Sequence, residues 1–150
     1  MNKKPIRLFS LVLAAVVLAA CSPAAPVQES ASITLTLENG ACAYAGPQII
    51  PAGSEISAQW VVKDTDQPAY TVGAFYLVPG KTLEDVRSGI AGSGATVGVM
   101  ESYGSAEVAA GGGSKEFQVR TSKSPLYFLC VADPLSEKFQ ILGPYEVQGG

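Results

Sequence analysis

Three stretches of the chain place apolar residues at every second position, and this period constrains the fold more than any other feature. They span residues 33–38, 56–62 and 115–120. Successive side chains of a β-strand point to opposite faces, so each stretch predicts a strand with one buried face. The chain is therefore expected to build a core between sheets.

Four further segments have strand character. Residues 69–78 are apolar on both faces, which is typical of a central strand. The other three are residues 97–103, 126–132 and 144–147. About seven strands with turn residues between them predict an antiparallel β-sandwich.

One short helix is predicted to interrupt the strands. Thr82 is placed to cap it, two acidic residues follow in its first turn, and Leu83, Val86 and Ile90 share one face. Acidic residues at this end complement the helix dipole. A Gly-rich passage over residues 89–98 is expected to end the helix.

The first twenty residues have the layout of a signal peptide. A basic stretch precedes an apolar run over residues 8–20, which is shorter than the roughly 20 apolar residues of a spanning helix. The run ends in Leu18-Ala19-Ala20-Cys21, which resembles the bacterial lipobox. The resemblance implies cleavage before Cys21 and a lipid on its sulfur. The alternative is an ordinary leader cut at an Ala-rich site.

These features divide the chain into three parts. Residues 1–20 are a predicted lipoprotein signal peptide, residues 21–32 a lipid-anchored linker with two prolines, and residues 33–150 one β-sandwich domain. The leader holds three of the ten basic residues and none of the thirteen acidic ones, so the remainder carries about −6. That charge disfavours nucleic acid as a partner.

The chain contains no histidine. Imidazole is the commonest transition-metal ligand and the commonest acid–base group near neutral pH. We therefore predict no catalytic residue, no metal site, no cofactor and no enzymatic activity. An acid pair such as Glu84 and Asp85 is the weak enzymatic alternative, because neighbours in one helical turn do not face each other across a substrate.

Two cysteines remain after Cys21, and they lie far apart in the sequence. Cys42 and Cys130 lack the Cys-x-x-Cys spacing of a redox pair, and an exported chain reaches compartments where disulfides persist. We predict a Cys42–Cys130 disulfide. A reactive thiol and a metal ligand remain the alternatives.

The segment Cys42-Ala43-Tyr44-Ala45-Gly46-Pro47 resembles the Cys-x-Tyr-x-Gly-Pro start of non-copper, cupredoxin-like domains on bacterial lipoproteins. Similar points are Ile50-Pro51-Ala52-Gly53, the helix start at residues 80–85, Tyr127-Phe128-Leu129-Cys130 and the closing residues 143–147. The resemblance implies a cupredoxin-like Greek-key sandwich. The Cys…Trp…Cys order of Cys42, Trp60 and Cys130 favours an immunoglobulin-like sandwich as the alternative.

A copper-bearing member of that family would hold the metal with two His, a Cys and a weak axial Met. Cys130 lies where the copper Cys is expected, but no His exists to join it, and Met100 is the only Met beyond the leader. The resemblance therefore implies the fold and not electron transfer. Copper handling or redox chemistry through Cys130 is kept as the alternative function.

Three minor features complete the candidate sites. Asp64-Thr65-Asp66 could hold a hard cation but lacks a full calcium loop, so a turn is expected. Gly89-Ile90-Ala91-Gly92-Ser93-Gly94 follows a helix instead of opening one and is expected to be a loop. Tyr103, Phe139 and Tyr145 lie near predicted loops or edges and are the aromatic residues best placed to contact a ligand.

The function predicted from these features is that of a lipid-anchored, extracytoplasmic β-sandwich module. It is a non-catalytic binding or structural protein of the bacterial cell envelope, attached to the membrane through its N-terminal lipid. Its partner, an envelope protein or a small ligand, has no signature in the sequence.

The lipobox predicts a covalent lipid on Cys21. We expect the protein to incorporate radioactive fatty acid in its host and to partition into detergent, because acyl chains favour an apolar phase. A Cys21→Ala variant should lose the label, and a matched Cys42→Ala variant should keep it. Labelling that persists in Cys21→Ala would contradict the assignment.

Overall fold

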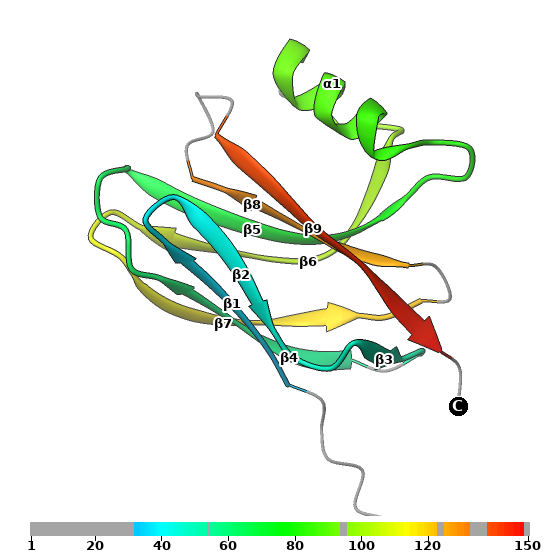
Figure 1. Ribbon diagram of the computed structural model, residues 1–150, viewed down its shortest axis with the longest axis horizontal. Helices are drawn as coiled ribbons and strands as arrows, with labels where there is room; N and C mark the ends of the chain where they lie inside the picture. The colour runs from blue at the N-terminus through cyan, green and yellow to red at the C-terminus, as the bar shows by residue number, and fades with distance from the viewer. Residues whose placement is uncertain (1–31, 54, 94–95, 123–124, 133–137, 149–150) are drawn as a thin grey trace, which may run out of the picture.

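The computed structural model describes residues 32–53, 55–93, 96–122, 125–132 and 138–148. The predicted signal peptide, Cys21 and the linker up to residue 31 lie outside the described residues. The described chain forms two packed β-sheets with one helix above them (Figure 1). The predicted β-sandwich with one short helix is thus confirmed.

The first sheet, called sheet one, has the strand order β2-β1-β4-β7. Its strands are β1 (Ser32–Glu38), β2 (Ala41–Ala45), β4 (Glu55–Val62) and β7 (Gly113–Arg120). Strand β1 pairs antiparallel with β2 and parallel with β4. The three sequence stretches with a period of two are the strands β1, β4 and β7 of this sheet.

Sheet two has the order β3-β9-β8-β5-β6. Its strands are β3 (Ile49–Pro51), β5 (Ala69–Leu77), β6 (Met100–Ala109), β8 (Leu126–Val131) and β9 (Phe139–Gln148). Strand β5 lies between β6 and β8, which confirms the segment predicted to be central. Its position explains its apolar residues on both faces, because the second face is covered as well.

The structure corrects the prediction in three respects. The described residues form nine strands instead of about seven, because β2 and β3 were not foreseen. The final strand begins at Phe139 and not at Pro144. Both sheets are mixed, since β1–β4 and β3–β9 are parallel pairs. These pairs also depart from the two antiparallel sheets of the immunoglobulin-like alternative.

The main core fills the space between the sheets. Trp60 and Tyr70 are fully buried there, and the Trp60 indole N–H donates to the Tyr70 carbonyl oxygen at 3.4 Å. The Tyr70 hydroxyl reaches the Asp66 carboxylate at 2.9 Å. The large rings therefore pack inside while their polar atoms find partners, as buried Trp and Tyr require.

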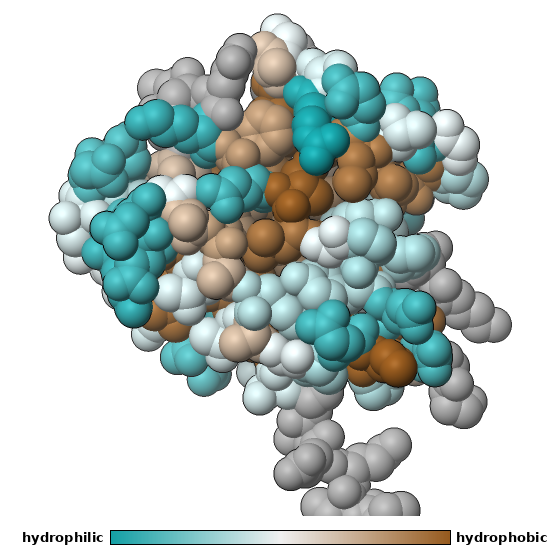
Figure 2. Space-filling model, viewed as in Figure 1, coloured by the Kyte–Doolittle hydropathy of each residue, from teal (hydrophilic) through white to brown (hydrophobic). Residues whose placement is uncertain are grey.

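Helix α1 (Leu83–Ser93) covers part of the outer face of sheet two. Thr82 caps it as predicted, with the Asp85 carboxylate accepting from the Thr82 backbone N–H at 2.8 Å. The helix continues past Gly89 to Ser93, so the glycines end it later than expected. Val86 packs on Phe75 and Leu129 beneath it, and apolar surface continues below the helix (Figure 2).

The two sheets meet along a seam between β6 and β7. Gly104 in β6 has φ +148°, and a Cβ at this position would lie 2.2 Å from the Gln118 carbonyl oxygen in β7. Only glycine allows the two backbones to approach this closely. The register of β6 against β5 shifts beside it, between Ala74 and Phe75.

Gly104→Ala should destabilise the fold by at least about 2 kcal/mol, because the methyl group would meet backbone and the conformation would be strained. Gly73→Ala is the matched control, since a Cβ at Gly73 meets nothing within 4 Å and its φ is not positive. We expect the control to be neutral or stabilising by less than about 1 kcal/mol. Urea unfolding measures both; equal effects of the two variants would contradict the close approach at the seam.

Candidate functional site

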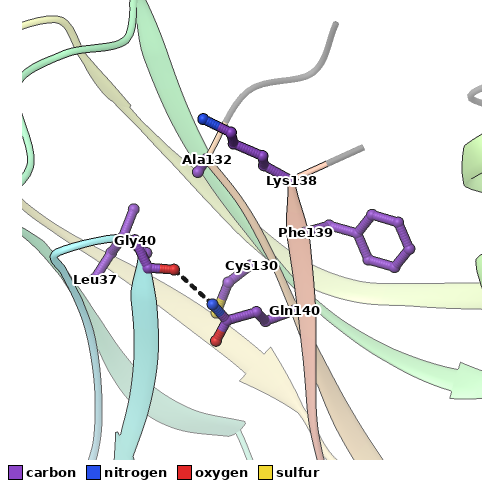
Figure 3. A pocket seen from close by; sticks show the side chains of 7 residues that line it. All are labelled: Leu37, Gly40, Cys130, Ala132, Lys138, Phe139 and Gln140. Atoms are coloured by element: carbon purple, nitrogen blue, oxygen red, sulfur yellow. Dashed lines mark hydrogen bonds between the residues drawn. The ribbon is translucent and has the colours of Figure 1, made fainter. Parts of the chain in front are cut away.

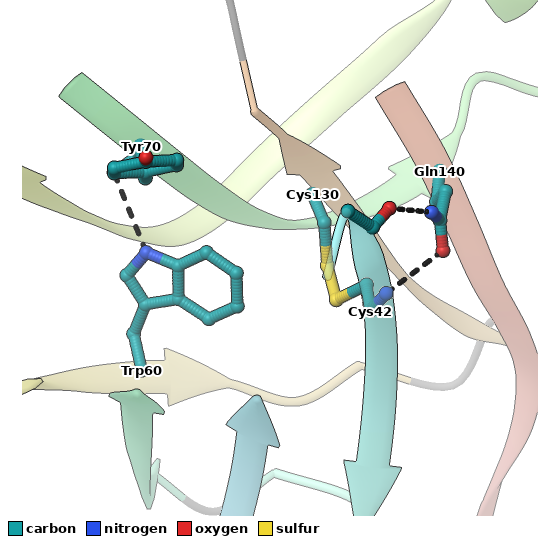
Figure 4. Close-up of a disulfide and its surroundings, with 6 residues drawn as sticks. Cys42, Trp60, Tyr70, Cys130 and Gln140 are labelled. Carbon is teal, nitrogen blue, oxygen red and sulfur yellow. Dashed lines mark hydrogen bonds between the residues drawn. A yellow bond between two sulfur atoms is a disulfide. The ribbon is translucent and has the colours of Figure 1, made fainter. Parts of the chain in front are cut away.

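Cys42 and Cys130 form a disulfide, as predicted. Cys42 lies in β2 of sheet one and Cys130 in β8 of sheet two, and their Cα atoms are 6.5 Å apart (Figure 4). Both residues are buried. The bond joins an edge strand of one sheet to an inner strand of the other, and it leaves neither sulfur available as a thiol.

Gln140 of β9 completes this connection between the sheets. Its Oε1 accepts from the Cys42 backbone N–H at 2.9 Å, and its Nε2 donates to the Gly40 carbonyl oxygen at 2.6 Å. One carboxamide thus pairs with the outer edge of β2 as a neighbouring strand would (Figure 4). An edge strand with unpaired backbone groups invites aggregation, so this contact protects the edge.

A hollow of about 180 Å³ opens beside the disulfide, where the ends of the two sheets separate. It is lined by Leu37, Gly40, Cys130, Ala132, Lys138, Phe139 and Gln140. Figure 3 shows the Phe139 ring pointing away from it and the Lys138 side chain running toward Ala132 at its edge. We call this hollow, with its seven lining residues, the end pocket.

The aspartates of the Asp64-Thr65-Asp66 turn serve the loops beside the end pocket. The Asp64 carboxylate accepts from the backbone N–H groups of Asn39 and Gly40 at 2.6 and 2.7 Å. Asp66 accepts from Tyr70, and hydrogen bonds from Gln67 and Tyr70 lower the pKa of its carboxyl. Both carboxylates are therefore used as the turn interpretation expects: Asp64 holds the β1–β2 hairpin against the next loop, and Asp66 fixes that loop to Tyr70.

The Cys-x-Tyr-x-Gly-Pro segment has a structural explanation. The Tyr44 hydroxyl donates to the Pro47 carbonyl oxygen at 2.6 Å, and a Cβ on Gly46 would lie 2.9 Å from that hydroxyl. The Tyr44 ring stacks on Tyr145 with centroids 4.0 Å apart. Burial and the neighbouring Tyr145 raise the pKa of Tyr44 to about 12. The motif closes a loop and packs on the core.

The three aromatic residues proposed as ligand contacts have different surroundings. Phe139 borders the end pocket, but its ring points away from it (Figure 3). Tyr145 is buried between Tyr44 and Phe128, so the structure does not place it on an open surface. Tyr103 is half-buried, lies edge-on to Tyr76 with ring centroids 4.8 Å apart, and borders a groove at the β6–β7 seam. Gln140 and Lys138 also line the end pocket, and no sequence pattern indicates either of them as a site residue.

Both members of the acid pair lie in the first turn of α1. Asp85 is engaged by the Thr82 cap, and Glu84 lies 3.9 Å from Arg87. Within the described residues, no group of three His, Cys, Asp or Glu side chains is placed to hold a metal ion. The described part of the chain also contains no helix of the length and apolarity that crossing a membrane requires.

Among the comparisons with known proteins, only the one with solved structures gives matches. No protein-family model and no curated protein matches the chain. Reduced auracyanin from Roseiflexus castenholzii matches with 13% identity and a TM-score of 0.47, over 73% of this chain and 93% of that one. Auracyanin A, a "blue" copper protein from Chloroflexus aurantiacus, matches with 11% identity and a TM-score of 0.46, over 78% and 98%.

Auracyanin B matches with 12% identity and a TM-score of 0.40, over 67% of this chain and 75% of that one. At this level of likeness, the copper of auracyanin A belongs to that protein and is not transferred to this chain. The cupredoxin-like family thus stays a prediction from the sequence, and the β-sandwich rests on the strand pairings themselves.

Gln140→Met should destabilise the protein by about 1 kcal/mol, because it leaves the half-buried backbone N–H of Cys42 without its acceptor, whereas the exposed Gly40 carbonyl can turn to water. The Cys42 amide should also exchange its hydrogen faster. Gln59→Met is the matched control, since Gln59 is exposed and its side chain has no hydrogen bond within the described residues. Its effect should stay within about 0.5 kcal/mol. Unchanged exchange at Cys42 in Gln140→Met would contradict the role of this carboxamide.

Proposed function

We propose that this protein is a lipid-anchored, non-catalytic binding module of the bacterial cell envelope. The lipobox-like Leu18-Ala19-Ala20-Cys21 supports the anchor. The disulfide fits an oxidising compartment outside the cytoplasm, since such bonds rarely persist inside it. The absence of histidine from the chain and the engagement of Glu84 and Asp85 favour recognition over catalysis.

The position of the end pocket is the observation that carries this proposal. The described chain begins at Ser32, at the start of β1 (Figure 1). The end pocket lies at the other end of β1, where Leu37 lines it. A chain tethered through residues 21–31 would hold the start of β1 toward the membrane. The end pocket would then face away from the membrane, toward envelope proteins.

The size and lining of the end pocket suggest what it binds. Its volume of about 180 Å³ is close to that of a cavity of ~150 Å³ that accepts benzene. Leu37 and Ala132 supply apolar walls, and both polar ends of Gln140 are already hydrogen-bonded. The end pocket therefore suits one apolar side chain of a protein partner, with Lys138 near its edge.

Copper handling through Cys130 has less support. A thiolate is the form of cysteine that binds copper, and the Cys130 sulfur is bonded to Cys42. Reduction of that bond would have to come first. We therefore propose no metal for this protein.

The test is photo-crosslinking in the host envelope. A photoreactive amino acid in place of Lys138 should give a defined crosslinked product, and one in place of Lys115 should not, because Lys115 lies in β7 away from the end pocket. Ala132→Phe, which fills the end pocket, should remove the product. Ala109→Phe, at an exposed position in β6, should leave it unchanged.

Two outcomes would contradict the proposal. One is a product from Lys138 that survives Ala132→Phe while the protein remains folded, because binding would then not use the end pocket. The other is the same product from Lys115. A non-reducing thermal unfolding curve for each variant establishes that the fold is retained.

A further inference from the structure

A second candidate site lies at the β6–β7 seam, away from the end pocket. It is a groove of about 410 Å³, lined by Glu55, Ser102, Tyr103, Gly104, Gln118 and Arg120. This volume falls within the ~300–1,000 Å³ typical of small-molecule sites. We call it the seam groove. It exists because Gly104 lets β6 approach β7 without a side chain between them.

The aromatic ring in the seam groove is held in a fixed position. The Tyr103 ring lies edge-to-face against Tyr76, with ring centroids 4.8 Å apart at an interplanar angle of 82°. Its hydroxyl donates to Glu101 Oε2 at 2.9 Å, and this hydrogen bond raises the pKa of Tyr103. A ring fixed at both ends loses little conformational entropy when a ligand packs on it.

The polar groups of the seam groove are available to a ligand. Within the described residues, the Ser102 hydroxyl and the Gln118 carboxamide have no hydrogen bond. The Arg120 guanidinium lies 3.2 Å from the Glu55 carboxylate, and both side chains are well exposed. Together these groups offer a ligand hydrogen-bond donors and acceptors side by side. The Ser102 hydroxyl and the Gln118 carboxamide can do both, and the Arg120 guanidinium donates.

The charge of the seam groove limits the ligands that it suits. One cation, Arg120, is already paired with Glu55, and the carboxylate of Glu101 lies beside the Tyr103 hydroxyl. An anionic ligand would therefore meet two carboxylates, and a metal cation would find no cluster of three ligating side chains among the described residues. A neutral ligand with many hydroxyl groups meets neither obstacle.

We propose that the seam groove binds a neutral saccharide. The C–H face of a sugar ring packs on the exposed part of the Tyr103 ring, since Tyr combines an apolar face with a polar tip. The sugar hydroxyls exchange hydrogen bonds with Ser102, Gln118 and Arg120. Such a ligand uses the ring and the polar groups of the seam groove at the same time.

An extended peptide fits the seam groove less well. Peptides bind to sheets most often by pairing with the exposed backbone edge of a strand. At Gly104 the β6 backbone lies directly against the Gln118 carbonyl of β7, so no strand can be added between them. The side-chain groups therefore carry the recognition.

The test uses the full chain, purified in a detergent without a sugar head group. Maltotriose, cellotriose and triacetylchitotriose are titrated separately while backbone amide shifts are followed by NMR. At least one trisaccharide should give saturable shifts centred on residues 102–104 and 118–120. Tyr103→Ala should weaken that binding about tenfold, and Tyr103→Phe should retain most of it because the ring remains.

A second variant keeps the proposal open to refutation if Tyr103→Ala unfolds. Gln118→Ala changes an exposed side chain and should also weaken saccharide binding severalfold, whereas Gln59→Ala in the same sheet should not. Absence of saturable shifts at the seam groove with all three sugars would overturn the proposal. Seam-groove shifts with tetra-alanine, but with none of the sugars, would instead assign the site to peptides. Neither result bears on the end pocket.

Discussion

The disulfide between Cys42 and Cys130 ties the edge strand β2 of sheet one to the inner strand β8 of sheet two. It closes a loop over a sequence separation of 88 residues, which in the chain-entropy model contributes roughly 4–5 kcal/mol. That is a large part of the ~5–15 kcal/mol by which a domain is stable. With β2 fixed, Gln140 can pair with its outer edge, and Cys130 of the same bond lines the end pocket.

Much of the fold follows from local patterns. The period of two at residues 33–38 and 115–120 predicted β1 and β7, and Thr82 with Asp85 predicted the start of α1. The sequence pattern does not predict strands β2 and β3, because both are short and β2, Ala-Cys-Ala-Tyr-Ala, has little β-propensity. Strand β3 is a strand through its pairing with the distant β9, and no local pattern records that contact. Strand β2 pairs with β1 across the two-residue Asn39-Gly40 turn, which is a local hairpin signal.

The candidate site was predictable in part. Two cysteines left after Cys21 were enough to predict the bridge, and the Asp64-Thr65-Asp66 turn was interpreted correctly. No sequence pattern indicates the role of Gln140. That role arises from the approach of β9 to β2 and not from the neighbours of Gln140 in the sequence. Tyr145 was misplaced for a related reason. The sequence places it near a predicted loop or edge, whereas stacking on Tyr44 buries it.

The link between the two sheets requires that the Cys42–Cys130 bridge be intact in the protein as the cell makes it. The direct measurement is peptide mapping by mass spectrometry of protein purified from the envelope, unfolded without reductant and treated with a thiol-alkylating reagent. We predict a linked Cys42–Cys130 peptide that separates only after reduction. Alkylated Cys42 and Cys130 in the unreduced sample would contradict the account and make Cys130 a reactive thiol.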